Sequence, residues 1–417
     1  SRSSVWLGGI FFKFCRLFIQ GFSFYNGTMI ELSQSDKNAL LERFIKYVKI
    51  WTTSDSKAAD SGMQPSTDRQ FDLARLLQKE LCELGLKDVQ VTEHCYVYGN
   101  LPASKGLESE KSFCLLAHLD TVEEVSGQNV KPIITQQNNA TIIHSDGTTL
   151  LGADDKAGIS AIMQALSYLF QHKELKHGQI EVCFSPDEET GHGMDNVPLN
   201  LIKSKQAYTV DGGECGQLEI ECFNAYKSEI IFTGVSQHTG TARGKLVNAI
   251  SMASSFINSL PHHQLPETTD GYMGFYAPME INGTIEQSNV TLFLRDFDEN
   301  AMNEKLKTVQ TLAESVALSF GGKVSVTHTC QYKNMKVGLE KSPATVDNLV
   351  QAYKNAGIEP IFTPIRGGTD GSRLTEMGIP TPNIFTGGSN FHSRQEFLSL
   401  NALCKCVEVL LNLAVKN

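Results

Sequence analysis

Short apolar runs in this chain are repeatedly followed by an aspartate, a glutamate or a histidine. The runs at 113–117, 182–184, 207–210 and 384–385 have the length and composition of buried β-strands. Strands of an α/β sheet present their carboxyl ends at one edge, where such folds bind ligands. We therefore expect one polar site, built from the residues that follow these runs: His118, Asp120, Glu188, Glu189, Asp211 and His392.

Alternating strand and helix patterns over the first half of the chain predict an α/β sandwich with a mixed or parallel sheet. Apolar residues at helical spacing predict helices over 35–48, 68–84 and 155–170, the first with Ser35 or Asp36 as its N-cap. The pattern changes after Cys222. There a strand, a helix, a strand, a long helix and a strand are predicted over 226–233, 246–260, 290–294, 300–320 and 323–329.

The late position of His392 indicates how these parts combine. A ligand near the C-terminus can serve a site built by the first half only if both ends fold together. We therefore expect residues 29–222 and 334–417 to form one catalytic domain, a mixed-sheet α/β sandwich. Residues 223–333, a stretch of about 110 residues, have the size of a small domain and are predicted to be an inserted α+β lid.

The first 28 residues do not match the rest of the chain. Their apolar stretch is broken by Lys13 and Arg16, so it is too short and too charged to span a bilayer as a helix. No A-x-A cleavage site follows it, which favours an upstream extension over a signal peptide.

Composition narrows the class of protein. With 41% hydrophobic and 20% charged residues the chain is typical of globular proteins, and its net charge of −10 argues against nucleic acid or anionic membranes as partners. Cysteines such as Cys114 and Cys183 lie inside strand-like runs, which favours reduced core thiols and a cytoplasmic location.

The polar residues after the strands suit a metal site. Two histidines with several carboxylates and no thiolate form a ligand set suited to zinc, with cobalt or manganese as alternatives. There are more carboxylates than one ion needs, which indicates two ions sharing a bridging carboxylate. Asp154, in the segment GADDKAG at 152–158, is our choice for the bridge. Asp154 and Asp155 as simple helix caps are the alternative.

The segment SPDEETG at 185–191 places three acids after a strand. On a surface loop they would be unremarkable, but at a buried edge they repel one another unless cations or protons neutralise them. Metal-assisted hydrolysis needs metal ligands and a general base. Of these adjacent acids, we assign Glu189 as a metal ligand and Glu188 as the general base. On an extended H-x-D segment both side chains point the same way, so His118 can bind metal while Asp120 orients its ring.

These motifs together resemble the M20 family of zinc peptidases, and within it the peptidase T branch of tripeptide aminopeptidases. The matching segments cover essentially everything from Met29 onward. They are AHLDT at 117–121, LLGADDKAGI at 150–159, SPDEETGHG at 185–193, VDGG at 210–213, FTGVSQHTGTARGKLVNA at 232–249, RDFD at 295–298, RGGTDGSRL at 366–374 and NIFTGGSNFHSRQEF at 383–397. The chain departs from the family pattern in a shorter stretch between Asp120 and Asp154 and in its first 28 residues.

The resemblance implies a role for each residue. One ion would be held by His118, Asp154 and Asp211, and the other by Asp154, Glu189 and His392. Asp120 would orient His118, and Glu188 would be the base. By resemblance His238 would contact the substrate carbonyl.

Two arginines are candidates for binding the C-terminal carboxylate of a peptide, since a guanidinium fork matches a carboxylate. They are Arg295, for which an ion pair with Asp296 or Asp298 is the alternative, and Arg366, which lies beside two glycines.

The predicted function is removal of the N-terminal residue from tripeptides. Carboxypeptidase or N-acyl-amino-acid amidohydrolase action on the same scaffold is the alternative, and a non-catalytic peptide-binding relative is a third. A homodimer formed through the inserted domain is also expected.

Overall fold

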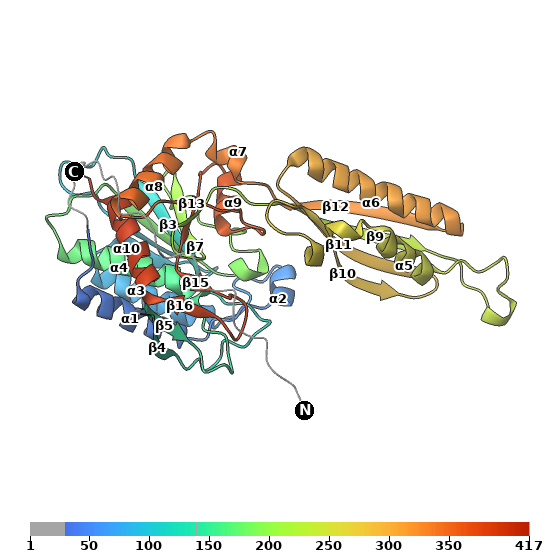
Figure 1. The fold of residues 1–417 in the computed structure, drawn as a ribbon, viewed down its shortest axis with the longest axis horizontal. Helices are drawn as coiled ribbons and strands as arrows, with labels where there is room; N and C mark the ends of the chain where they lie inside the picture. The colour runs from blue at the N-terminus through green and yellow to red at the C-terminus, as the bar shows by residue number, and fades with distance from the viewer. Residues whose placement is uncertain (1–29, 139, 417) are drawn as a thin grey trace, which may run out of the picture.

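The computed structural model describes residues 30–138 and 140–416, so the predicted leader at 1–28 lies outside the described residues. Two bodies of different size are visible (Figure 1). The larger contains both ends of the described chain, and the smaller extends from it as an elongated lobe. Within the described ranges, no helix is long and apolar enough to cross a membrane.

An eight-stranded mixed sheet is the centre of the larger body. Its order is β1-β2-β6-β3-β7-β14-β8-β13, with parallel pairing of β6, β3, β7 and β14 in the middle. The pairs β1-β2, β2-β6 and β14-β8 are antiparallel, and the edge strand β13 pairs in parallel with β8. The central strands β3 and β6 are buried along their whole length, as expected for strands covered on both faces. The bounds are β1 Lys87–Val91, β2 Val97–Leu101, β3 Phe113–His118, β6 Ile180–Ser185, β7 Ala207–Gly212, β8 Gln217–Glu219, β13 Ile361–Phe362 and β14 Asn383–Phe385.

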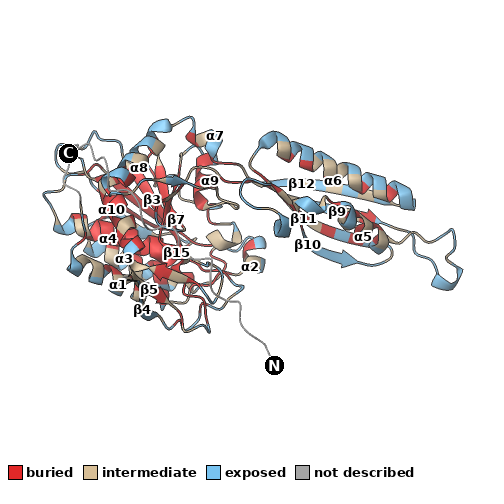
Figure 2. Ribbon diagram, in the orientation of Figure 1, coloured by how far each residue is buried: buried red, intermediate tan, exposed pale blue. Residues whose placement is uncertain are grey.

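Helices cover this sheet, and the main hydrophobic core lies between them and one sheet face (Figure 2). The long helix α4 packs against β3, β7, α1 and α10. On the opposite face, Tyr96, Leu116 and Met194 belong to a smaller core cluster that also includes Leu374. The bounds are α1 Gln34–Val48, α2 Ser56–Asp60, α3 Gln70–Glu83, α4 Ala153–Gln171, α7 Lys336–Leu339, α8 Pro343–Asn355, α9 Asp370–Glu376 and α10 Leu400–Ala414.

The predicted N-cap of the first helix was wrong by two or three residues. Ser33, not Ser35 or Asp36, is the N-cap of α1. Ser33 and Asp36 instead form a capping box, in which each side chain accepts a hydrogen bond from the backbone N–H of the other.

A second sheet of the larger body was not predicted. It has the order β15-β16-β5-β4 and lies against α4 and α10. The bounds are β4 Ile133–Gln137, β5 Ala140–His144, β15 Gly388–Ser389 and β16 Phe397–Ser399. Because β15 and β16 flank His392, this sheet ties the C-terminal loop to the hairpin of β4 and β5.

The smaller body is a four-stranded antiparallel sheet of order β10-β11-β9-β12, with α5 and α6 packed on one face (Figure 1). Its own apolar core includes Phe232, Phe256 and Val309. The bounds are β9 Asn224–Thr233, α5 Ala249–Ser259, β10 Phe275–Gly283, β11 Gln287–Asp296, α6 Glu299–Phe320 and β12 Lys323–Tyr332. The prediction lacked β10. The mixed sheet with a smaller α+β lid confirms the predicted fold class, while the chosen domain limits stay a prediction.

Candidate active site

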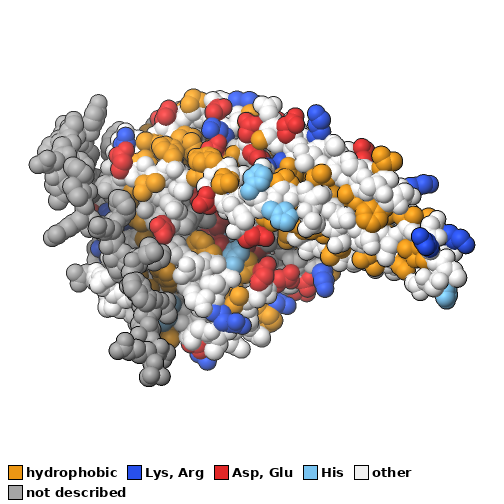
Figure 3. All heavy atoms as spheres, turned by 45° about the vertical axis from the view of Figure 1, so that its right-hand side comes forward, with side chains coloured by type: hydrophobic (Ala, Val, Ile, Leu, Met, Phe, Trp, Pro, Cys, Tyr) orange, Lys and Arg blue, Asp and Glu red, His pale blue; other side chains and the backbone are white. Residues whose placement is uncertain are grey.

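Five segments that are far apart in sequence bring polar side chains together beyond the central strands. His118 is the last residue of β3, Asp211 lies in β7, and Asp154 lies at the start of α4. Glu189 follows β6, and His392 lies in the loop between β15 and β16. Acidic and histidine side chains line a hollow in the molecular surface (Figure 3). The expected meeting at one edge therefore occurs for His118, Glu189, Asp211 and His392, and Asp154 joins them from the start of α4.

Asp154 lies at the centre of this group. Its Oδ1 is 2.9 Å from Nε2 of His118, and its Oδ2 is 3.2 Å from Nε2 of His392. Nε2 of His392 is also 3.1 Å from Oε2 of Glu189, and Nε2 of His118 is 3.6 Å from Oδ1 of Asp211. A carboxylate between two histidines, with one further acid beside each, has the arrangement of a bridge between two ions.

Asp155 has a different position. Its Oδ1 accepts a hydrogen bond from the N–H of Gly158, and its Oδ2 accepts one from the N–H of His118. The side chain is fully buried and caps the start of α4 while fixing the end of β3. Although an oxygen of Asp155 lies within 4.8 Å of His118 and Asp211 ligand atoms, both of its oxygens already have backbone partners.

The donor set fits divalent cations. Ligand atoms of His118, Asp154 and Glu189 all lie within 4.8 Å of one another. Oε1 of Glu189 is buried and has no hydrogen-bond partner among the described residues. An unpaired buried carboxylate oxygen is costly, and a cation is the partner that this group of nitrogen and oxygen ligands suits best.

Among protein atoms alone, Glu189 and Asp211 hold protons unusually tightly, whereas hydrogen bonds to His118 and His392 outweigh burial and lower the pKa of Asp154. Burial, followed by the charge of Asp154, raises the pKa of Glu189 to about 8 and that of Asp211 to about 7. Hydrogen bonds to Asp154 and Glu189 raise the pKa of His392 to about 11. Burial and neighbouring negative charge therefore both favour a bound proton or a cation in this cluster.

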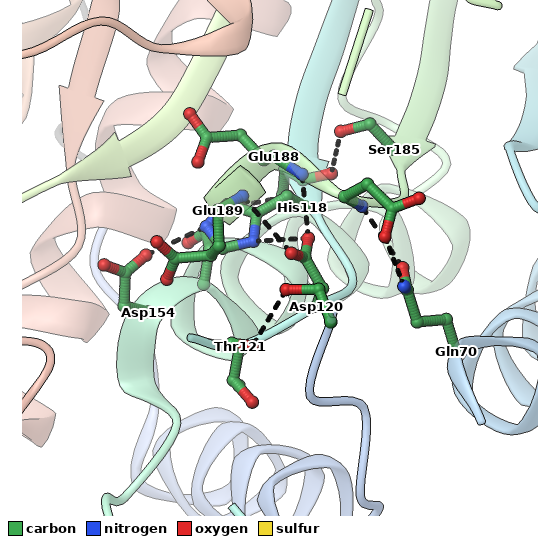
Figure 4. Close-up of polar contacts among 12 residues, drawn as sticks. Gln70, His118, Asp120, Thr121, Asp154, Ser185, Glu188 and Glu189 are labelled. Carbon is green, nitrogen blue, oxygen red and sulfur yellow. Dashed lines mark hydrogen bonds and ion pairs between the residues drawn. The ribbon is translucent and has the colours of Figure 1, made fainter. Parts of the chain in front are cut away.

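Asp120 holds the turn that carries both glutamates (Figure 4). Its Oδ1 accepts from the N–H of Glu188 at 3.0 Å and its Oδ2 from that of Glu189 at 3.2 Å. Oδ1 also lies 3.3 Å from Nδ1 of His118. The Glu188 and Glu189 side chains leave the turn on the side where Asp154 lies, and burial raises the pKa of Glu188 well above its usual range.

The sequence profile of the peptidase family M20/M25/M40 matches residues 114–416. The chain belongs to this family. It is 42% identical over 405 residues to a peptidase T of Geobacillus thermodenitrificans, which covers 90% of this chain and 98% of the relative.

Solved structures show the same fold. A crystal structure of aminopeptidase PepT from Bacillus cereus has a TM-score of 0.75 at 24% identity, covering 90% of this chain and 97% of that one. A tripeptidase from Staphylococcus aureus has a TM-score of 0.75 at 23% identity with the same coverage.

In this M20 peptidase, the hydrogen bonds made by the three predicted substrate-binding residues go to groups outside the cluster. His238 is exposed and accepts from the N–H of Gly240 within its own loop. That loop, at 234–248, lies at the end of the lid farthest from the catalytic domain (Figure 1). Arg295 donates to the carbonyls of Tyr226 and Leu294, inside the lid, and has no ion pair with Asp296 or Asp298 within the described ranges.

Arg366 joins the two bodies. Its guanidinium donates to the carbonyl oxygens of Gly271, Met273 and Thr269 in the lid. It also lies over the rings of Phe223 and Phe275, at 5.1 and 5.6 Å from their centroids. In this arrangement its donors face the lid backbone, so carboxylate binding by Arg295 or Arg366 stays a prediction.

Several residues that shape the site were missed by the sequence analysis. A cavity of about 190 Å³ next to Glu188 and Glu189 is lined by Tyr332 from the end of β12 and by Thr369, Asp370 and Arg373. Glu396 is buried and accepts from the N–H groups of Leu151, Gly152 and Asp154, which fixes the start of α4. These residues were missed because none of them directly follows an apolar strand. The family resemblance did offer a signal, since Thr369, Asp370 and Arg373 lie in the matching segment 366–374 and Glu396 lies in 383–397.

We predict that the metal-free protein loses stability as pH rises. Glu189, Asp211 and His392 all have folded-state pKa values above their ordinary values, so the folded state binds protons more tightly than the unfolded state. This stabilisation is complete below the unfolded values and is lost as pH rises through the folded ones. The melting temperature of chelator-treated protein should therefore fall between about pH 5 and pH 8.

Adding zinc should restore the melting temperature, and by more at the higher pH, since metal ligands must lose protons to bind. Calorimetry with and without zinc measures this directly. A metal-free protein with the same melting temperature across this range would contradict the assignment of a crowded, buried acid cluster.

Proposed function

We propose that this M20 peptidase is an aminopeptidase that removes the N-terminal residue from tripeptides and uses two zinc ions. The observation that carries the proposal is Glu188, an acid with a raised pKa beside a cluster of two histidines and three carboxylates. The relative named peptidase T, with 42% identity over nearly its whole length, favours the tripeptide reading over carboxypeptidase or N-acyl-amino-acid amidohydrolase action.

Zinc is favoured over cobalt and manganese because histidine and carboxylate ligands at a solvent-accessible edge are its usual catalytic set. We assign His118, Asp154 and Asp211 to one ion, and Asp154, Glu189 and His392 to the other. When bound, the ions would activate the attacking water and polarise the scissile carbonyl.

Glu188 is the proton carrier in this proposal. A carboxylate accepts the proton of the attacking water and returns it to the leaving amine, and this requires a pKa nearer neutrality than that of a free glutamate. Burial raises the pKa of Glu188 in that direction. Asp120 keeps the group in place through the backbone N–H of Glu188 and faces Nδ1 of His118.

Glu188→Gln should lower kcat by roughly 10²- to 10⁴-fold, since it removes the base. The zinc content measured by elemental analysis should stay at the wild-type value, because Glu188 is not among the proposed ligands. Glu304→Gln, an exposed residue on α6, is the matched control and should retain wild-type turnover. Near-normal turnover of Glu188→Gln would defeat the assignment.

A panel of tripeptides tests the substrate class. The free tripeptide should lose its N-terminal residue, detected by mass spectrometry, and the N-acetylated form should be resistant. Cleavage of the acetylated form instead would move the protein to the carboxypeptidase or deacylase branch.

In the same panel, Arg295→Lys and Arg366→Lys should raise KM for the free tripeptide more than for its C-terminal amide if either arginine binds the carboxylate. An equal effect on both would exclude that role.

His238 can contact the carbonyl of a bound substrate only from a second copy of the chain or after a large movement of the lid, given the position of its loop (Figure 1). We propose the first, a homodimer formed through the lid. In an isologous dimer, each contact that one copy makes with its partner is repeated by the partner. If His238 of one copy reaches the site of the other, the reverse contact therefore also forms.

Mixing His238→Ala and Glu188→Gln subunits tests this arrangement. Each variant alone should have low activity. After subunit exchange, mixed dimers contain one site with neither change, so about a quarter of wild-type activity should return. Recovery is measured with the free tripeptide. No recovery, with light scattering showing that mixed dimers formed, would count against a shared site.

We also propose an intracellular location. Cys114 and Cys183 are buried thiols on neighbouring strands β3 and β6, and thiols in cores are typical of reducing compartments.

A further inference from the structure

The turn that carries Glu188 is held by hydrogen bonds to three consecutive backbone amides. The N–H groups of Glu188 and Glu189 donate to Asp120, and the N–H of Asp187 donates to Oε1 of Gln70 at 3.2 Å. Gln70 is the first residue of α3, 117 positions away from Asp187 along the chain. It belongs to none of the motifs that predicted the site.

Gln70 and Asp187 form a reciprocal pair. Nε2 of Gln70 donates to Oδ1 of Asp187 at 2.6 Å, while Oε1 accepts from the Asp187 backbone (Figure 4). Ser66 completes the contact, since its N–H and its hydroxyl both donate to the Asp187 carboxylate. Gln70 and Asp187 are both fully buried, so water cannot replace these bonds.

Asp187 needs this support because its backbone has φ 57°, in the left-handed region. A residue other than glycine reaches that region at a cost and stays there only when its surroundings hold it. This conformation directs the chain from the end of β6 into the turn at Glu188. Because Glu188 directly follows Asp187, a change in the backbone conformation of Asp187 would displace the Glu188 carboxylate.

We propose that Gln70 is a positioning residue for Glu188. It contacts neither the metal-ligand cluster nor the cavity beside Glu188, and it acts through Asp187. The inference rests on the proposed role of Glu188 as the base and adds a residue on which that role depends. The competing explanation is that Gln70 only satisfies buried polar groups and contributes to stability alone.

Gln70→Met is the informative variant, because it keeps the length of the side chain and removes both the donor and the acceptor. It should lower kcat for the free tripeptide about 10- to 100-fold, as removal of an orienting partner does at metal sites. KM should change less than about twofold, and zinc content should be unchanged, since substrate and metal contacts remain.

Gln164→Met is the matched control. Gln164 is also a buried glutamine in a helix of the catalytic domain, but its Oε1 has no hydrogen-bond partner in the described structure and it lies in the middle of α4. Its turnover should equal that of the wild type.

The deciding measurement is the effect of Gln70→Met in a Glu188→Gln background. If Gln70 acts through Glu188, the second change should lower the residual kcat by less than about threefold, because residues acting as a unit are not additive. The same fold-decrease in both backgrounds, or wild-type kcat for Gln70→Met alone, would overturn the inference. If Gln70→Met does not fold, Gln70→Glu keeps the acceptor and is measured in the same way.

Failure of the proposed function is distinguishable from failure of this inference. In the first case the wild-type protein does not cleave the free tripeptide. In the second it does, and the loss on replacing Gln70 is absent or independent of Glu188.

Discussion

Crowding of buried carboxylates at one sheet edge is the constraint on which the rest of this structure depends. Asp154, Asp211, Glu188 and Glu189 come within reach of two histidines in a site that desolvates them. Burial and like charge both oppose ionisation of these acids. Ionised carboxylates at this sheet edge therefore destabilise the folded state. Cations remove that penalty, which makes metal binding and stability two aspects of one electrostatic balance.

A second group of acids keeps the first in place, and it works through backbone N–H groups. Asp120 accepts from the Glu188 turn, and Glu396 from the segment that leads to Asp154. Asp187 accepts from Ser66. The hydrogen bonds that Asp187 and Glu396 accept favour their ionised forms and offset part of the effect of burial, which raises the pKa of both. Buried acids at this edge therefore fall into two groups, those that form the candidate metal site and those that hold backbone amides in place.

Sequence alone could indicate three of the proposed ligands from a local pattern, because His118, Glu189 and Asp211 end or closely follow buried strands. Asp154 begins a helix and His392 lies in a loop, so their assignment needed the wider set of motifs. The supporting residues could not be predicted in this way, since Gln70 and Glu396 act on segments 117 and 242 to 245 positions distant. Strand β10 was missed for a local reason. It contains Pro278, an irregular register between Pro278 and Glu280, and an exposed second half, so it lacks the alternation of an interior strand.

The cavity beside Glu188 and Glu189 lies where the lid meets the catalytic domain. Arg366 ties the lid backbone at 269–273 to the loop that continues into Thr369 and Asp370, both of which line the cavity beside Glu188. Tyr332, at the end of lid strand β12, lines the same cavity. A movement of the lid must therefore either move the cavity lining at Thr369 and Asp370 with it or break the hydrogen bonds from Arg366 to the lid backbone. The acid cluster is built by the catalytic domain alone, whereas the cavity beside it is lined by residues of both bodies, so the shape of the cavity depends on how the two bodies are held together.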